Sequence, residues 1–184
     1  TLEAVGALWG MNAIVTIDKD PERFDAANVT SGVFPALGVK PMLGRNFTPD
    51  EEIYGRNFDQ AIISDRIWRT RYGASPSVLG KALRLNGRTR TIVGVMPKDF
   101  RFPETADFWV PAGNDPADPG KRSDGWLKVI ARMKPDVTKA QAQAEVATIW
   151  SGFVREDPEM KDLGVRVVGY QENWARDVRS IMLV

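Results

Sequence analysis

The most chemically suggestive spacing in the chain is one that imitates a phosphate-binding loop. Residues 73–82 read GASPSVLGKA, and contain a Gly-Lys pair like the one that contacts nucleotide phosphates. The nucleotide-binding pattern needs four residues between its glycines and a Ser or Thr after the lysine, whose hydroxyl binds Mg²⁺. Here six residues separate Gly73 from Gly80, and Ala82 follows Lys81. We therefore interpret residues 73–82 as a helix end followed by a loop.

Other chemistry is limited by the residue types that the sequence lacks. The 184 residues include no His and no Cys, which excludes thiol nucleophiles, His-based triads and the usual zinc ligand sets. Acidic residues cluster at 18–22 and 50–52, but neither cluster has the Gly and terminal Glu of a calcium loop. No spacing singles out a carboxylate pair for acid–base catalysis. We expect no catalytic, cofactor-binding or metal-binding residue, and no enzymatic activity.

Charge gives no reason to expect a nucleic-acid partner. Lys and Arg number 25 against 24 Asp and Glu, a net charge of +1, whereas nucleic-acid binding domains usually carry a basic face. One local group of basic residues surrounds the sequence LNG at 85–87 and consists of Lys81, Arg84, Arg88 and Arg90. No aromatic residues are interleaved with them, so we expect a solvated hairpin face that discourages edge pairing.

The elements that position these residues follow from hydrophobic periodicity and turn signals. Strand patterns occur at 11–18, 23–30, 60–64, 106–112, 126–134 and 164–170. Helix patterns occur at 31–38, at 64–73 with Ser64 or Asp65 as cap, and at 138–157 with a Thr138/Gln141 capping box. Asn86-Gly87 lies between two β-prone runs in 81–96, which predicts a tight hairpin.

The order of these elements predicts an α+β fold. Two strand-helix-strand units are expected near 24–47 and 126–170, on either side of a β-rich middle. This arrangement predicts a discontinuous α/β subdomain formed by 1–57 plus 124–184. Residues 58–123 are expected to form an inserted β-rich lobe.

A series of motifs in this order resembles a known family. The stretches 29–52, 61–103 and 108–111 are similar to the extracytoplasmic (periplasmic) core domain of MacB-type ABC transporter permeases. Physically the matching residues suit a scaffold, because the glycines fit tight turns or close backbone approach and the aromatics fill a core. The residues that match the family motifs are Phe34, Gly38, Pro41, Gly44, Arg45, Phe47, Gly80, Asn86, Gly87 and Gly94.

The resemblance implies a non-catalytic role in transport. It implies a porter-like α/β subdomain on the extracytoplasmic side of the cell membrane, which couples membrane-helix movement to export of a substrate. It implies an ABC ATPase domain or subunit and a second permease copy as partners, and leaves open an adaptor or outer-membrane channel. The apolar run at 173–184 is then expected to be a helix, capped by Asn173, that leads into the second membrane helix.

The sequence also leaves two further function classes open. A periplasmic ligand- or peptide-binding module would need an apolar cleft, and a hydrolase would need a polar pocket with paired carboxylates. One local contact is also expected. Arg45 lies five to seven residues before Asp50-Glu51-Glu52, so we predict a charge-assisted hydrogen bond that fixes the loop between them.

Overall fold

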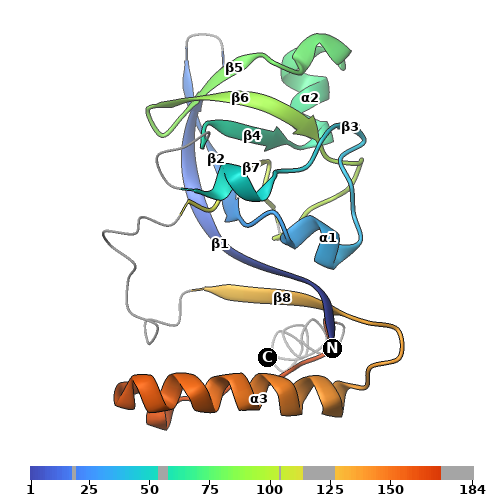
Figure 1. The fold of residues 1–184 in the computed structure, drawn as a ribbon. Coiled ribbons are helices and arrows are strands. Elements are labelled where there is room, and N and C mark those ends of the chain that lie inside the picture. The colour runs from blue at the N-terminus through green and yellow to red at the C-terminus, as the bar shows by residue number, and fades with distance from the viewer. Residues whose placement is uncertain (18–19, 54–57, 104, 114–126, 171–184) are drawn as a thin grey trace, which may run out of the picture. The chain divides into compact units, whose positions relative to one another are not determined.

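The computed structural model describes residues 1–17, 20–53, 58–103, 105–113 and 127–170 (Figure 1). The chain divides into two compact units. The larger comprises Glu3–Gly120 and Gly125–Arg132, and the smaller Thr1–Leu2, Lys121–Asp124 and Met133–Val184. Nearly all of the described strand residues belong to the larger unit, and the long C-terminal helix belongs to the smaller one.

The larger unit is built on a mixed sheet in which six strands pair in a closed ring, a small β-barrel. In the order of pairing, these strands are β1 (Leu2–Thr16), β2 (Pro21–Val29), β7 (Phe108–Pro111), β4 (Gln60–Ile63), β6 (Arg88–Val95) and β5 (Ala82–Leu85). Strand β1 closes the ring, since it pairs antiparallel with β2 over nine residues and with β5 over two. The β2–β7 and β4–β6 pairs are parallel. Closure leaves no ring strand with an unpaired edge along its whole length.

Two short or peripheral strands extend the ring. Strand β3 (Leu43–Gly44) pairs with the end of β6, and β8 (Lys128–Met133) is the neighbour of β1. The strands expected from the sequence pattern at 11–18, 23–30, 60–64, 106–112 and 126–134 are therefore confirmed. β1 begins at Leu2, much earlier than expected.

Consecutive residues of the ring strands pack into two different hydrophobic cores. Side chains alternate across a strand, so Ile63 and Phe108 lie in one core while their neighbours Ile62 and Trp109 lie in the other. All six ring strands contribute to the first core, which is therefore the barrel interior. The second core includes Phe34 and lies on the outer face of the sheet.

Two short helices cover these cores. Helix α1 (Val33–Leu37) buries Phe34 and ends at Gly38, whose φ of 72° lies in the left-handed region. Helix α2 (Asp65–Tyr72) buries Ile67 in the barrel core. The predicted caps of α2 are confirmed: the Ser64 side chain accepts a hydrogen bond from the Ile67 N–H, and Gly73 ends the helix.

The smaller unit is dominated by helix α3 (Lys139–Glu156). Its predicted Thr138/Gln141 capping box is present. Of the apolar side chains of α3, Ala142 is fully buried, whereas Ile149 is 51% exposed. Helix η4 (Pro158–Asp162) follows, and its Met160 is buried.

The strand expected at 164–170 is wrong. Residues 163–169 form no regular element, and three of their backbone groups bond to side chains of α3. Gln143 accepts from the Val167 N–H at 2.7 Å and donates to the Val165 carbonyl at 3.1 Å. Trp150 Nε1 donates to the Leu163 carbonyl at 3.2 Å. The strand-like alternation of 163–167 thus reflects an extended segment that pairs with a helix.

The few helices and large sheet confirm the α+β class. The compact units differ from the division expected from the sequence, which joined 1–57 to 124–184 and set 58–123 apart. The difference arises because β1 and β2 pair with β5 and β7, so both segments share one sheet.

Among the described residues, no helix is both long and apolar enough to span a membrane.

Candidate functional site

The motif residues of the sequence gather at two places in the larger unit. One group lies where β3 pairs with the end of β6 and consists of Pro41, Gly44, Arg45 and Gly94. The other lies in and beside the β5–β6 hairpin and consists of Gly80, Asn86 and Gly87. The remaining three, Phe34, Gly38 and Phe47, belong to α1 and to the outer core. Nothing in this distribution brings them together as one reactive centre.

Where β3 pairs with β6, the two backbones lie too close together to leave room for a side chain at Gly44 or Gly94. Gly44 has a φ of 77°, and a Cβ there would lie 2.2 Å from the Val93 carbonyl oxygen. A Cβ on Gly94 would lie 2.6 Å from the Arg45 carbonyl oxygen. The strands are joined by the Arg45 N–H, which donates to Val93 at 2.9 Å. The glycines of the P-x-x-G-R-x-F element are therefore required by space as well as by conformation.

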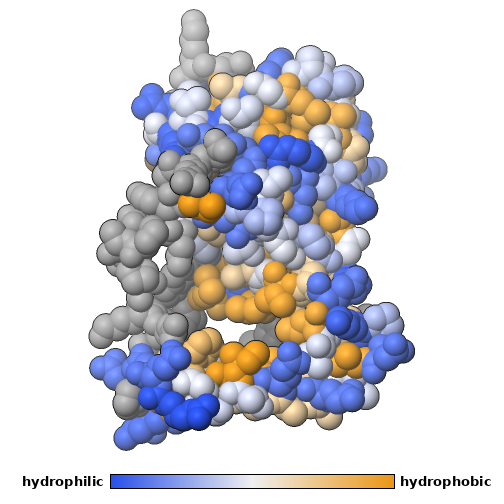
Figure 2. Space-filling view, in the orientation of Figure 1, coloured by the Kyte–Doolittle hydropathy of each residue, from blue (hydrophilic) through white to orange (hydrophobic). Residues whose placement is uncertain are grey.

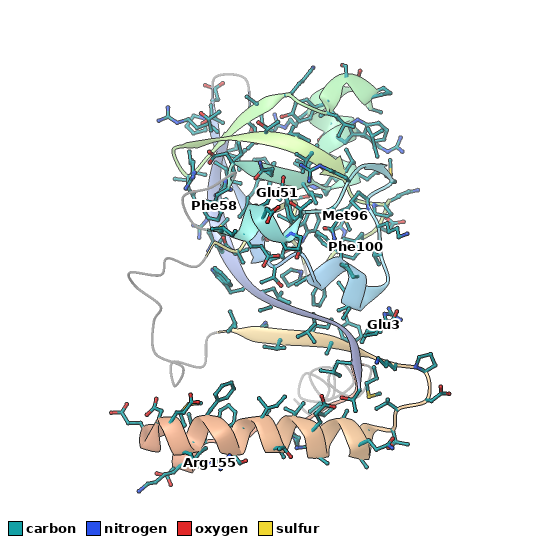
Figure 3. All side chains as sticks on the ribbon, in the orientation of Figure 1. Glu3, Glu51, Phe58, Met96, Phe100 and Arg155 are labelled. Carbon is teal, nitrogen blue, oxygen red and sulfur yellow. The ribbon has the colours of Figure 1, made fainter. Side chains whose placement is uncertain are left out.

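Arg45 then turns back onto a buried carboxylate. Its Nη1 and Nη2 donate to the two oxygens of Glu51 at 2.9 and 2.6 Å, in a bidentate pair. Glu51, in η1 (Pro49–Glu52), is only 5% exposed and also accepts the Thr48 N–H at 2.9 Å (Figure 3). The predicted Arg45 contact with the 50–52 cluster is confirmed, and its partner is Glu51.

These contacts decide the charge state of the carboxyl group. Burial by itself would raise the pKa of Glu51. The hydrogen bonds from Arg45 and from the Thr48 backbone, with the charge of Arg45, outweigh burial and hold that pKa below its ordinary value. Glu51 therefore stays ionised as a fixed anion inside the loop.

Further bonds tie this loop to the start of α1. Glu52 Oε1 accepts the Ser31 N–H, and Asn46 Nδ2 donates to the Ser31 carbonyl at 3.1 Å. Phe47 packs in the outer core beside Phe34, with ring centroids 6.4 Å apart. The 45–52 loop, which we call the Arg45 clamp, is thus fastened to both the sheet and α1.

The hairpin residues close the barrel. Asn86 and Gly87 have φ values of 49° and 78°, the two left-handed residues that the tight turn requires. The Asn86 side chain accepts the Ile14 N–H at 2.8 Å, and the Asn86 N–H donates to the Ile14 carbonyl at 2.8 Å. Asn86 therefore extends the two-residue β1–β5 seam. Gly80 (φ 82°) donates its N–H to the Ile92 carbonyl, consistent with a loop at 73–82.

Arg90 corrects one expectation for the hairpin. Arg90 is only 6% exposed, although we expected the basic residues around the turn to be solvated. Its Nη1 donates to the Phe58 carbonyl at 2.8 Å and its guanidinium lies 5.3 Å from the Phe58 ring centroid. Burial, together with the nearby positive charge of Arg88, lowers the pKa of Arg90 to about 10. Arg90 lies on the same buried face of β6 as Ile92, and the alternation of side chains along a strand could have indicated this from the sequence.

The arrangement closest to a catalytic set involves residues that the sequence did not indicate. Ser64 Oγ donates to Asp107 Oδ1 at 2.7 Å, and Arg66 binds both oxygens of the same carboxylate. Asp107 is thereby committed to an ion pair, and Ser64 is committed to capping α2. No base is left in this group to activate the hydroxyl. In the described part of the chain, no group of three acidic side chains is arranged to hold a metal ion.

Several solved protein structures have a fold similar to that of this chain. The periplasmic region of MacB from Actinobacillus actinomycetemcomitans aligns at a TM-score of 0.64 and 15% identity, covering 83% of this chain and 67% of that one. The extracellular domain of the noncanonic ABC-type transporter YknZ from Gram-positive bacteria aligns at 0.58 and 18%, covering 80% and 74%. A domain of a putative permease from Porphyromonas gingivalis aligns at 0.60 and 18%, covering 87% and 66%. At these identities the likeness shows the fold alone.

The sequence comparison identifies the family. No curated protein matches the chain significantly. The family of MacB-like periplasmic core domains matches over residues 2–149, which is most of the chain. The chain therefore belongs to the MacB-like periplasmic core domain family.

Proposed function

We propose that this domain is the extracytoplasmic part of an ABC-type transporter permease and transmits movement of the membrane helices to export of a substrate. The family membership and the similar folds of periplasmic and extracellular permease domains support this role. In this proposal ATP is hydrolysed by a separate nucleotide-binding domain or subunit, and the permease functions as a dimer. An adaptor or outer-membrane channel would act as a further partner where the cell envelope has one.

The proposal rests on which segments of the chain make up the smaller unit. This unit contains the first residues of the chain together with the segment from Met133 onward. The Thr1 carbonyl accepts the Lys134 N–H at 3.0 Å. Two chain segments that the family resemblance would connect to membrane helices are thus held in one unit.

Two strands connect the units. Along β1 the chain passes from the smaller unit into the barrel unit at Leu2–Glu3, along β8 it returns to the smaller unit at Arg132–Met133, and the two strands are neighbours in the sheet. β1 is then held by nine residue pairs with β2, all within the barrel unit. A paired strand bears tension along many hydrogen bonds at once, so it would transmit movement better than a flexible linker.

The test inserts two glycines after Asp177 in the intact transporter and measures export and ATP hydrolysis separately. If the predicted helix at 173–184 transmits movement, hydrolysis continues while export falls, because a Gly-rich joint absorbs motion. The same insertion after Pro119, in a stretch rich in Pro, Gly and Asp, should leave both activities unchanged. Unchanged export with the Asp177 insertion would show that this segment is only a tether.

A further inference from the structure

The barrel unit contains a pocket that the motif residues do not explain. It has a volume of about 260 Å³ and lies among the first turns of α2, the turn at 97–101 and residues 105–107. We call it the α2 pocket. Four basic side chains line it: Arg66, Arg69, Lys98 and Arg101.

The acidic residues of the pocket are mostly neutralised already. Asp107 is held by Arg66, and Asp65 by Arg69 at 2.9 Å. These pairs leave donors unused: Arg66 binds Asp107 through Nε and Nη2, and Arg69 binds Asp65 through Nε. Arg66 Nη1 and both Nη atoms of Arg69 have no acceptor among the residues that the structure describes.

Lys98 and Arg101 add two more uncommitted cations. Both side chains are exposed, and neither has an ion pair with any described residue. Lys98 is a central residue of a tight turn in which the Phe100 N–H donates to the Pro97 carbonyl at 3.1 Å, and Arg101 directly follows this turn. Asp99, in this turn, has a φ of 64°, a conformation that is uncommon for a residue other than glycine. Against this single remaining acid, the pocket has an excess of positive charge and of N–H donors.

We propose that the α2 pocket binds an organic phosphate. Donors approach from two sides, Arg66 and Arg69 from α2 and Lys98 and Arg101 from the turn. This arrangement suits a tetrahedral oxyanion with several acceptor oxygens better than a planar carboxylate, which one arginine fork satisfies. Phe100 and Pro97 also line the pocket and provide an apolar surface for the organic part. The site stands independently of the coupling role proposed above.

Such a phosphate has two sources, a soluble phosphate ester or the headgroup of an anionic phospholipid. The purified chain is titrated with glycerol 1-phosphate by calorimetry, and co-sedimented with phosphatidylcholine vesicles with and without phosphatidylglycerol. The pocket variant is Lys98→Gln with Arg101→Gln. The control is Lys40→Gln with Lys128→Gln, which removes the same charge from exposed positions outside the pocket.

We expect saturable binding that the pocket variant weakens about tenfold or more, because two charge-assisted contacts are lost, while the control pair binds like the parent. Pocket-dependent binding of glycerol 1-phosphate identifies a soluble ester, and pocket-dependent binding only to phosphatidylglycerol vesicles identifies a headgroup. Absence of saturable binding to both probes, or equal weakening by the control pair, would overturn the proposal. If the double variant melts early, the single variants Lys98→Gln and Arg101→Gln provide the same comparison.

Discussion

The two units of the chain bury their apolar residues to very different degrees. In the barrel unit, consecutive residues of single strands fill two cores, and side chains as large as Trp109 and Phe34 are fully buried. In the smaller unit, Ala142 and Met160 are buried, whereas Ile149, Leu163 and Tyr170 are 51%, 44% and 55% exposed. Both hydrophobic and hydrophilic residues lie on the visible surface of α3 (Figure 2).

This difference shows how one small domain can combine stiffness with adaptability. Hydrophobic burial and a closed ring of hydrogen bonds stabilise the barrel unit as one body. The smaller unit relies more on a helix, its capping box and side-chain bonds to an extended segment. Regions with few buried apolar contacts open at lower free energy. In the coupling role proposed above, the barrel would be the rigid part and the smaller unit the part that responds to movement.

The largest contrast is expected from matched phenylalanine truncations. Phe34→Ala should lower the free energy of unfolding by about 3–5 kcal/mol, because a fully buried ring in contact with Phe47, Phe100 and Trp109 leaves a cavity. Phe153→Ala, in α3, should cost only about 1 kcal/mol because that ring is partly exposed. Urea denaturation measures both, and equal losses would contradict the contrast.

A pair of glycine substitutions sharpens the same comparison. Gly94→Ala should destabilise by about 2–3 kcal/mol, because the added Cβ meets a backbone carbonyl at 2.6 Å that cannot easily move. Gly152→Ala should stabilise by about 0.5–1 kcal/mol, since a Cβ there meets nothing within 4 Å and alanine favours a helix. Thermal melts distinguish the two, and a destabilising Gly152→Ala would show that α3 is more tightly packed than described.

The Arg45 clamp should give a smaller effect that depends on pH. Arg45→Ala leaves Glu51 buried without its cation, at an expected cost of about 1–2 kcal/mol at neutral pH, moderated because Arg45 is half exposed. Because the folded pKa of Glu51 is lowered, its stabilising contribution is complete above the ordinary glutamate value of about 4.3. The contribution is lost as pH falls through the folded pKa.

The difference between wild type and Arg45→Ala should therefore shrink as pH falls below about 4. Denaturation at neutral and acidic pH measures it. Arg71→Ala is the control, since its pair with Glu22 is exposed on both sides and should matter little. A pH-independent difference, or no difference at neutral pH, would contradict the clamp.

Local signals in the sequence predicted the parts of the fold that depend on neighbouring residues. The Asn86-Gly87 turn, the Ser64 and Gly73 caps of α2 and the Thr138/Gln141 box are all present. Each involves groups within a few residues, so residue type alone decides them. The Arg45 contact was predictable for the same reason, because Glu51 is six residues away.

Features that depend on distant residues were not predictable. Closure of the barrel joins β1 to β5, about 70 residues along the chain, and no sequence pattern specifies that pairing. The Ser64–Asp107 bond spans 43 residues. The segment at 163–167 has strand-like periodicity, but its partners are Gln143 and Trp150 of a helix. The predicted helix at 173–184 lies outside the described residues.

Hydrogen exchange in the intact transporter tests the division of roles most directly. Mass spectrometry would compare amide exchange in the nucleotide-free and ATP-bound states for peptides from both units. We predict that peptides from β4, β6 and β7 keep the same slow exchange in both states, while peptides within 133–170 change with nucleotide. Nucleotide-dependent exchange in the barrel strands, with none in 133–170, would contradict the account.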